Sequence, residues 1–127
     1  TAKLLASRGA TLSLADRDEA GLAAAVKGLE GTGHIVTVVD VRDSKSVNDW
    51  IEGTVRQLGK LDGAANIAGV VNLDRPIREE TDEGWAFGMD VNAKGVFYCI
   101  RAELNYLSPN GSIVGAASRI QHYADFY

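Results

Sequence analysis

Apolar residues along the chain follow two alternating periods, one typical of helices and one typical of strands. Helical spacing predicts helices over residues 2–7, 18–31, 44–59 and 81–107. Alternating or continuous apolar runs predict strands over residues 11–15, 34–39, 61–68 and 112–116. Helices and strands in this order are typical of parallel strands joined by right-handed helical crossovers. The pattern therefore predicts an α/β fold built on an open parallel sheet.

The same pattern predicts which side chains form the core and where elements end. Helix 44–59 points four side chains inward: Val47, Ile51, Val55 and Leu58. The long helix 81–107 points five inward: Trp85, Val91, Val96, Ile100 and Leu104. The β-branched run 34–39 predicts a strand that is buried on both faces. Asp18 can cap the second helix, whose end is marked by Gly31 and Gly33, and Pro109-Asn110-Gly111 predicts a turn.

Ligands of open parallel sheets bind beyond the carboxyl ends of the strands. The first such end carries Asp16 and Arg17. An acid at this strand tip can accept hydrogen bonds from a ribose 2′-hydroxyl and repels a 2′-phosphate, so Asp16 favours NAD over NADP. Arg17 favours the opposite choice, because a guanidinium can pair with that phosphate. The alternative is that Asp16 is only a helix-capping acid.

The next two strand ends offer further binding groups. Asp40 can accept a hydrogen bond from an exocyclic amine, and Val41 offers an apolar surface to a ring. Asn66 can tie neighbouring strand ends together, while Ala68 and Gly69 let the backbone approach a ligand, with Gly69 free to adopt an unusual φ. The alternative is that these are ordinary turn residues.

Two more residues are candidates for catalysis. Asn92 lies inside the long predicted helix, where asparagine is unfavourable, and it can disturb the helical hydrogen bonds and hold a water. Ser118 follows the last strand and can donate to a substrate oxygen. The alternatives are a solvent-facing asparagine and a loop serine that bonds local backbone.

Composition narrows the classes of function. The net charge of −4 and a pI near 5.1 argue against a nucleic-acid surface, and no apolar run approaches the ~20 residues of a membrane span. The single cysteine, Cys99, cannot form an internal disulfide, which favours a reducing compartment, and its place beside Ile100 predicts a core residue. His34 and His122 have no partner at metal-ligand spacing, so we expect no metal site.

Taken together, these residues resemble the short-chain dehydrogenase/reductase family, in the family's order and over essentially the whole chain. The matching segments are Ala15–Asp18, Asp40-Val41, Asn66-Ile67-Ala68-Gly69, Val91–Phe97, and Gly111–Val114 leading to Ser118. The chain departs from the family at Ile67, where a second asparagine is usual. The glycine-rich loop that precedes the first match and the Tyr-x-x-x-Lys pair that follows Ser118 are absent, and Tyr123 is not followed by such a lysine. We therefore expect a fragment or a processed chain.

The resemblance implies a Rossmann-like, doubly wound parallel sheet that is incomplete, with residues 1–127 forming part of an NAD(P)-binding domain. It places the missing first strand between the first and third strands of this chain. The implied activity is hydride transfer between NAD, rather than NADP, and a small alcohol or ketone substrate. Asn92 and Ser118 are the implied catalytic residues, and the cofactor-binding set is Asp16, Arg17, Asp40, Val41, Asn66, Ala68 and Gly69.

Further expectations concern the protein as a whole. The resemblance implies an enzyme that forms a dimer or tetramer through the long helix between Trp85 and Leu104. Charge, hydropathy and the single cysteine favour a cytoplasmic protein without nucleic-acid or membrane partners. The isolated 127 residues would be inactive without the tyrosine and lysine. The alternative is a non-catalytic NAD(P)-binding sensor with the same fold. A flavodoxin-like receiver module would need a lysine at a late strand end, and the sequence has none there.

Overall fold

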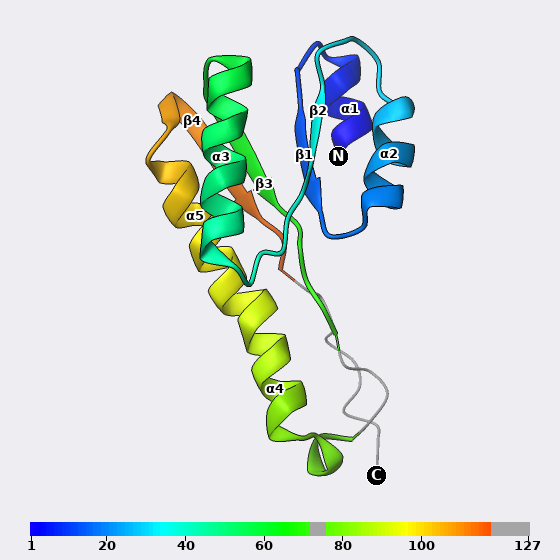
Figure 1. The fold of residues 1–127 in the computed structure, drawn as a ribbon, viewed down its shortest axis with the longest axis vertical. Helices are drawn as coiled ribbons and strands as arrows, with labels where there is room; N and C mark the ends of the chain where they lie inside the picture. The colour runs from blue at the N-terminus through cyan, green and yellow to red at the C-terminus, as the bar shows by residue number, and fades with distance from the viewer. Residues whose placement is uncertain (72–75, 118–127) are drawn as a thin grey trace.

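Helices and strands alternate along the chain in the computed structural model, which describes residues 1–71 and 76–117 (Figure 1). The first half contains α1 (Ala2–Ser7), β1 (Ser13–Asp16), α2 (Glu19–Lys27), β2 (Ile35–Val38), α3 (Ser44–Leu58) and β3 (Leu61–Asn66). The second half contains η1 (Ile77–Glu79), α4 (Asp82–Met89), the π-helix η2 (Asp90–Gly95), α5 (Val96–Leu104) and β4 (Leu107–Gly115). The predicted α/β class is confirmed.

Strands β1 and β2 form one parallel pair, in which Ser13 lies opposite Ile35 and Asp16 lies opposite Val38. Helix α2 packs against both strands. The helix ends at Lys27, so the expectation that it reaches Gly31 is wrong. Gly31 and Gly33 instead lie in the turn before β2, with φ of 89° and 79°. Glycine adopts these angles without the steric penalty that a Cβ imposes. The two glycines therefore allow the tight turn before β2 and do not mark the end of the helix.

Strands β3 and β4 form a second parallel pair, covered by α3 and α5. Their register shifts between Leu61, which lies opposite Leu107, and Gly63, which lies opposite Ser112. The predicted turn at 109–111 falls inside this irregularity, and Asn110 has a φ of 69°. The turn residues therefore form a bulge within a longer strand instead of preceding the strand.

The two pairs are separate two-stranded sheets, and β1 is not hydrogen-bonded to β3. The resemblance places a further strand between β1 and β3, and this stays a prediction. Helix α3 connects the pairs through side chains: Trp50 Nε1 donates to Ser13 Oγ at 2.8 Å, and Ser13 Oγ shares a 2.7 Å hydrogen bond with Thr54 Oγ1.

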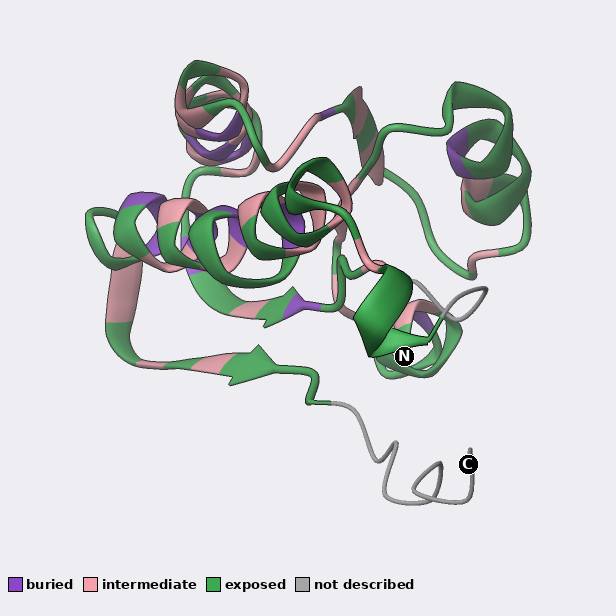
Figure 2. Cartoon of the chain, turned by 90° about the horizontal axis from the view of Figure 1, so that it is seen from below, coloured by how far each residue is buried: buried purple, intermediate pink, exposed green. Residues whose placement is uncertain are grey.

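The main core lies between α3, α5 and the strands, where buried positions of facing helices meet (Figure 2). Its members are Val39, Val47, Ile51, Leu61, Cys99 and Ala102. Val47 and Ile51 were predicted from the spacing of α3, and Cys99 was predicted to be core, so these predictions are confirmed. Figure 2 also shows that the outer sides of the helices are exposed.

Two predictions about burial are wrong. Trp85 and Leu104 are each 62% exposed, although the long helical run that carries them forms as expected. In β2, Val36 and Val38 are 44% and 53% exposed, whereas Ile35 and Thr37 are half-buried. Side chains alternate between the faces of a strand, so only one face of β2 is covered by the residues that the structure describes. A β-branched run indicates a strand, but which faces are covered depends on neighbours that the run does not specify.

Candidate functional site

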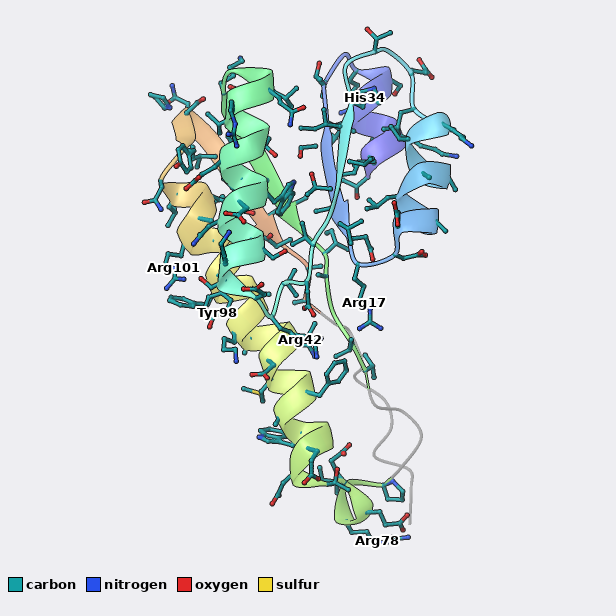
Figure 3. All side chains as sticks on the ribbon, viewed as in Figure 1. Arg17, His34, Arg42, Arg78, Tyr98 and Arg101 are labelled. Atoms are coloured by element: carbon teal, nitrogen blue, oxygen red, sulfur yellow. The ribbon has the colours of Figure 1, made fainter. Side chains whose placement is uncertain are left out.

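The strands in each pair are parallel. In Figure 1 all four strands run in the same direction, so their carboxyl ends lie at one edge of the molecule, which is called the ligand edge below. Arg17, which follows β1, and Arg42, which follows β2, both lie at this edge (Figure 3). The helical run from α4 to α5 passes beside it (Figure 1). Most of the residues predicted to bind a ligand therefore come from segments that meet here.

Asp16 is the last residue of β1 and is exposed. Its Oδ1 accepts a hydrogen bond from the backbone N–H of Asp18 at 3.0 Å, which closes a tight turn at the strand tip. Asp18 occupies the N-cap position of α2, but its side chain makes no capping hydrogen bond, contrary to expectation. Asp16 is therefore a turn-forming carboxylate that faces solvent at the ligand edge, rather than the cap of the helix.

Asp40 is bound by Arg42, two residues further along the chain. Arg42 Nε donates to both carboxylate oxygens at 3.0 Å, and the Arg42 backbone N–H donates to Oδ1 at 2.9 Å. The hydrogen bond from the Arg42 side chain lowers the pKa of Asp40 to about 2. The same guanidinium lies 5.3 Å from the ring centroid of Phe87 in α4. Sequence analysis missed Arg42, although an arginine two positions after an acid at a strand tip was the available signal.

Val41 contacts the π-helix. A Cβ built on Gly95 would lie 2.8 Å from Val41 Cγ2 and 3.3 Å from the Val41 carbonyl oxygen. Such distances are shorter than real Cβ contacts, so only glycine allows η2 to approach the loop after β2 this closely. Val41 is half-buried, with part of its apolar side chain left at the surface. The glycine in the predicted asparagine segment therefore has a packing role that the sequence alone did not reveal.

Asn66 ends β3 and is buried, and its side chain does not bridge strands as expected. Its Nδ2 donates to Glu103 Oε2 in α5 at 3.0 Å, while its backbone oxygen accepts from Ala116 N at 2.9 Å. Glu103 is only 1% exposed, and this burial raises the pKa of its carboxyl group. Sequence analysis missed Glu103, although its position four residues after the core residue Cys99 places both on one helix face.

Asn92 lies in the π-helix and pairs with the loop that follows β3. Its Oδ1 accepts from Val70 N and its Nδ2 donates to Val70 O, each at 2.8 Å. The expected disturbance of the helical hydrogen bonds is thus present as a π-helix. Asn92 is exposed, as the alternative expected, and its amide also bonds Val70. Each polar atom of its amide makes one hydrogen bond to Val70 and keeps the capacity for a second one.

Ala68 and Gly69 are exposed in the same loop, as a close approach to a ligand requires. Gly69 is not among the residues with positive φ, so the expectation of an unusual φ there is wrong. A Cβ on Gly69 would lie 3.4 Å from Asn92 Oδ1. The absence of a side chain at Gly69 therefore leaves room for the side chain of Asn92. Ser118, the other predicted catalytic residue, lies outside the residues that the structure describes.

Other reactive side chains have structural partners. His34 Nδ1 accepts from Leu12 N at 3.0 Å, and its Nε2 lies 2.8 Å from Glu30 O, so both ring nitrogens are used. Burial, followed by the charge of Glu103, raises the pKa of Cys99 to about 11, which leaves the thiol protonated.

Within residues 1–71 and 76–117, no cluster of three acidic, histidine or cysteine side chains could hold a metal. No helix in the same residues is both long and apolar enough to cross a membrane.

Comparisons with known proteins give a consistent result. A family model described as enoyl-(acyl carrier protein) reductase matches residues 1–124. The short-chain dehydrogenase/reductase ABA4 of Pyricularia oryzae is 40% identical over 124 residues, which cover 93% of this chain and 46% of that protein. Chanoclavine-I dehydrogenase ifgE of Penicillium roqueforti is 35% identical, and the match covers 100% of this chain and 55% of that protein.

Solved structures agree with these matches. A dehydrogenase/reductase from Sinorhizobium meliloti superposes with a TM-score of 0.84 at 29% identity, covering 98% of this chain and 50% of that one. Levodione reductase gives a TM-score of 0.85 at 29% identity, covering 92% of this chain and 48% of that one. The chain thus spans about half the length of the proteins it matches.

Proposed function

Because this chain belongs to the short-chain dehydrogenase/reductase family, we propose that the complete protein is an oxidoreductase that interconverts a secondary alcohol and a carbonyl compound. Residues 1–127 would form part of its NAD(P)-binding domain. The observation that carries the proposal is the pairing of Asn92 with Val70, which joins the π-helix to the loop after β3 at the strand-end edge.

The residues at this edge fit a dinucleotide. Asp16 presents an exposed acceptor for ribose hydroxyls, and Val41 presents an apolar surface beside it in the neighbouring loop. Asp40, held by Arg42, would accept from the exocyclic amine of adenine, whereas Ala68 and Gly69 leave room for the ligand. When bound, the nicotinamide would accept a hydride from the alcohol carbon or donate one to the carbonyl carbon. We propose NAD over NADP, since Asp16 would repel a 2′-phosphate.

The catalytic residues would act on the substrate oxygen and its proton. Ser118 would donate a hydrogen bond to that oxygen and polarise the carbonyl group. Asn92, whose amide is paired with Val70, would support a water in the proton path.

The test is to express the full reading frame that encodes these residues and to supply NAD or NADP with a panel of secondary alcohols, or NADH or NADPH with ketones. We expect the absorbance of the reduced nicotinamide to change with at least one pair, and more strongly with NAD(H). Asn92→Leu, which cannot pair with Val70, should reduce the rate by at least about tenfold. If neither cofactor changes with any substrate in the panel, the proposal fails.

The assembly and location of the protein are part of the proposal. Apolar side chains are exposed along the helical run, among them Trp85, Phe97 and Leu104, which favours a homo-oligomer formed through this surface. Light scattering should give the mass of a dimer or tetramer for the complete protein and a lower mass for Phe97→Glu. A monomeric complete protein would contradict the assembly. The single cysteine, buried and unable to form an internal disulfide, favours a cytoplasmic location.

A further inference from the structure

Glu103 is the most deeply buried ionisable side chain near the candidate site. It is 1% exposed, and its Oε2 accepts the 3.0 Å hydrogen bond from Asn66. Among the residues that the structure describes, no lysine or arginine forms an ion pair with it. Burying a carboxyl group costs free energy unless a specific partner stabilises it. An apolar side chain would fill the same place on α5 without that cost, so core packing alone does not explain an acid at this position.

Asn66, the partner of Glu103, stands where three segments meet. Its side chain binds α5, and its backbone oxygen accepts from Ala116, two residues before Ser118. It is also the last residue of β3, so the chain leaves the β-ladder at Ile67 and enters the loop that faces the ligand edge. Asn66 therefore contacts α5 through its side chain, and the end of β4 through the backbone from which this loop begins.

The far end of the loop is fixed to the same helical run. Val70 is bound through both its backbone N–H and its carbonyl oxygen by Asn92. Ile67, Ala68 and Gly69 lie between the two anchors and are exposed. Within the described residues, these three are thus held from their ends, at Asn66 by Glu103 and at Val70 by Asn92. These three residues belong to the loop that follows β3, at the edge where we propose that the dinucleotide binds.

We propose that Glu103 is a positioning residue for the dinucleotide, acting through Asn66 on the peptide groups of residues 67–69. This inference rests on the proposed function. Glu103 makes no contact with the ligand and takes no part in the chemistry. Removing its acceptor frees the Asn66 amide to rotate, and the loop then samples orientations that do not match the cofactor. The consequence falls on cofactor affinity rather than on the chemical step.

The test uses the complete protein and isothermal titration with NADH and NADPH. Glu103→Leu has similar bulk and no acceptor, whereas Glu103→Gln keeps an oxygen that can accept from Asn66. We expect Glu103→Leu to raise the dissociation constant of the preferred cofactor about tenfold, as the loss of one buried hydrogen bond implies. Glu103→Gln should restore it to within about threefold of the wild type. Glu103→Ala also removes the acceptor but leaves space for water, and it must show the same loss of cofactor affinity. It takes the place of Glu103→Leu in the test if that variant does not fold.

Thr54→Val is the matched control, because it also removes a buried side-chain hydrogen bond, the one to Ser13, at a distance from the loop. It should lower the melting temperature and leave the dissociation constant unchanged. The inference fails if Glu103→Leu and Glu103→Ala bind the cofactor as the wild type does, if Glu103→Gln gives no rescue, or if Thr54→Val weakens binding equally. A wild-type protein that binds neither cofactor would overturn the proposed function, and this inference with it.

Discussion

The two sides of the ligand edge are held together in different ways. At the ends of β1 and β2, the polar contacts are local: Asp16 binds Asp18, and Asp40 binds Arg42, each two residues apart. At the end of β3 they are long-range: Asn92 reaches Val70 across 22 positions, and Glu103 reaches Asn66 across 37. Both sides reach the core, through Val39 on the first side and Leu61 on the second, but the first side also exposes the β2 valines Val36 and Val38.

This difference separates the parts of the site that fold by themselves from those that depend on tertiary packing. A local turn around a carboxylate forms wherever the backbone allows it and loses little when a neighbour changes. A long-range side-chain bond exists only while the helix that carries it is packed. We therefore expect the β3 side to be sensitive to changes in the core and the β1–β2 side to be tolerant.

The largest expected effect comes from Ile51→Ala in α3. Ile51 is fully buried in the core that supports β3 and α5, so truncation leaves a cavity and should cost about 2–5 kcal/mol in the free energy of unfolding. Val36→Ala on the exposed face of β2 should cost less than about 1 kcal/mol. Urea unfolding of the complete protein measures both changes. Equal losses would show that the two sides are equally packed and would contradict the comparison.

The next effect tests the close approach of the π-helix to Val41. Gly95→Ala places a Cβ 2.8 Å from Val41 Cγ2, so one element must move, at a cost of about 1–3 kcal/mol. Gly88→Ala in α4 is the matched control, since its Cβ would meet nothing within 4 Å. It should stabilise the protein by about 0.5–1 kcal/mol through helix propensity. The midpoint of urea unfolding should therefore fall in Gly95→Ala and rise in Gly88→Ala. An unchanged midpoint in Gly95→Ala would refute the packing argument.

Sequence reasoning predicted the elements and the local groups, because these depend on periodicity and on residues near one another. The order of helices and strands and the buried face of α3 at Val47 and Ile51 followed from spacing. The interruption at Asn92 followed from the low helix propensity of asparagine. Long-range partners could not be predicted in this way. The pairing of Glu103 with Asn66 and the contact of Gly95 with Val41 depend on how α5 and η2 pack against the strands, which no spacing encodes.

Exposure was the other feature that spacing did not determine. The apolar positions Trp85 and Leu104 have helical spacing, but the described residues do not cover them. A periodic apolar face indicates that a helix packs against other residues. It does not indicate whether those residues belong to the same chain. The same reasoning applies to Val36 and Val38 in β2, where alternation predicts a strand and leaves its second face undetermined.

A smaller effect appears in the pH dependence of stability. Burial raises the pKa of Glu103 above its ordinary value of 4.5, so the folded state favours the protonated form. Its contribution is therefore fully present below pH 4.5 and is lost as the pH rises through the raised pKa. The stability of the wild type relative to Glu103→Gln should decline across this interval. Urea unfolding at a series of pH values tests this, and a difference independent of pH would show that Glu103 does not titrate differently on folding.

The smallest expected effect concerns Asp40 on the local side. Arg42 lowers the pKa of Asp40 from its ordinary value of 3.8 to about 2, so the stability it adds is present above pH 4 and is lost as the pH falls through 2. In Arg42→Ala, the pKa of Asp40 should return toward 3.8, as followed by NMR titration of its carboxyl carbon. Arg101→Ala is the matched control, because Arg101 also stacks on an aromatic ring, 4.9 Å from the centroid of Phe97, but binds Ser44 rather than Asp40. If Arg101→Ala moved the Asp40 titration as far as Arg42→Ala does, the local contact would not be what fixes this carboxylate, and the contrast between the two sides would lose its basis.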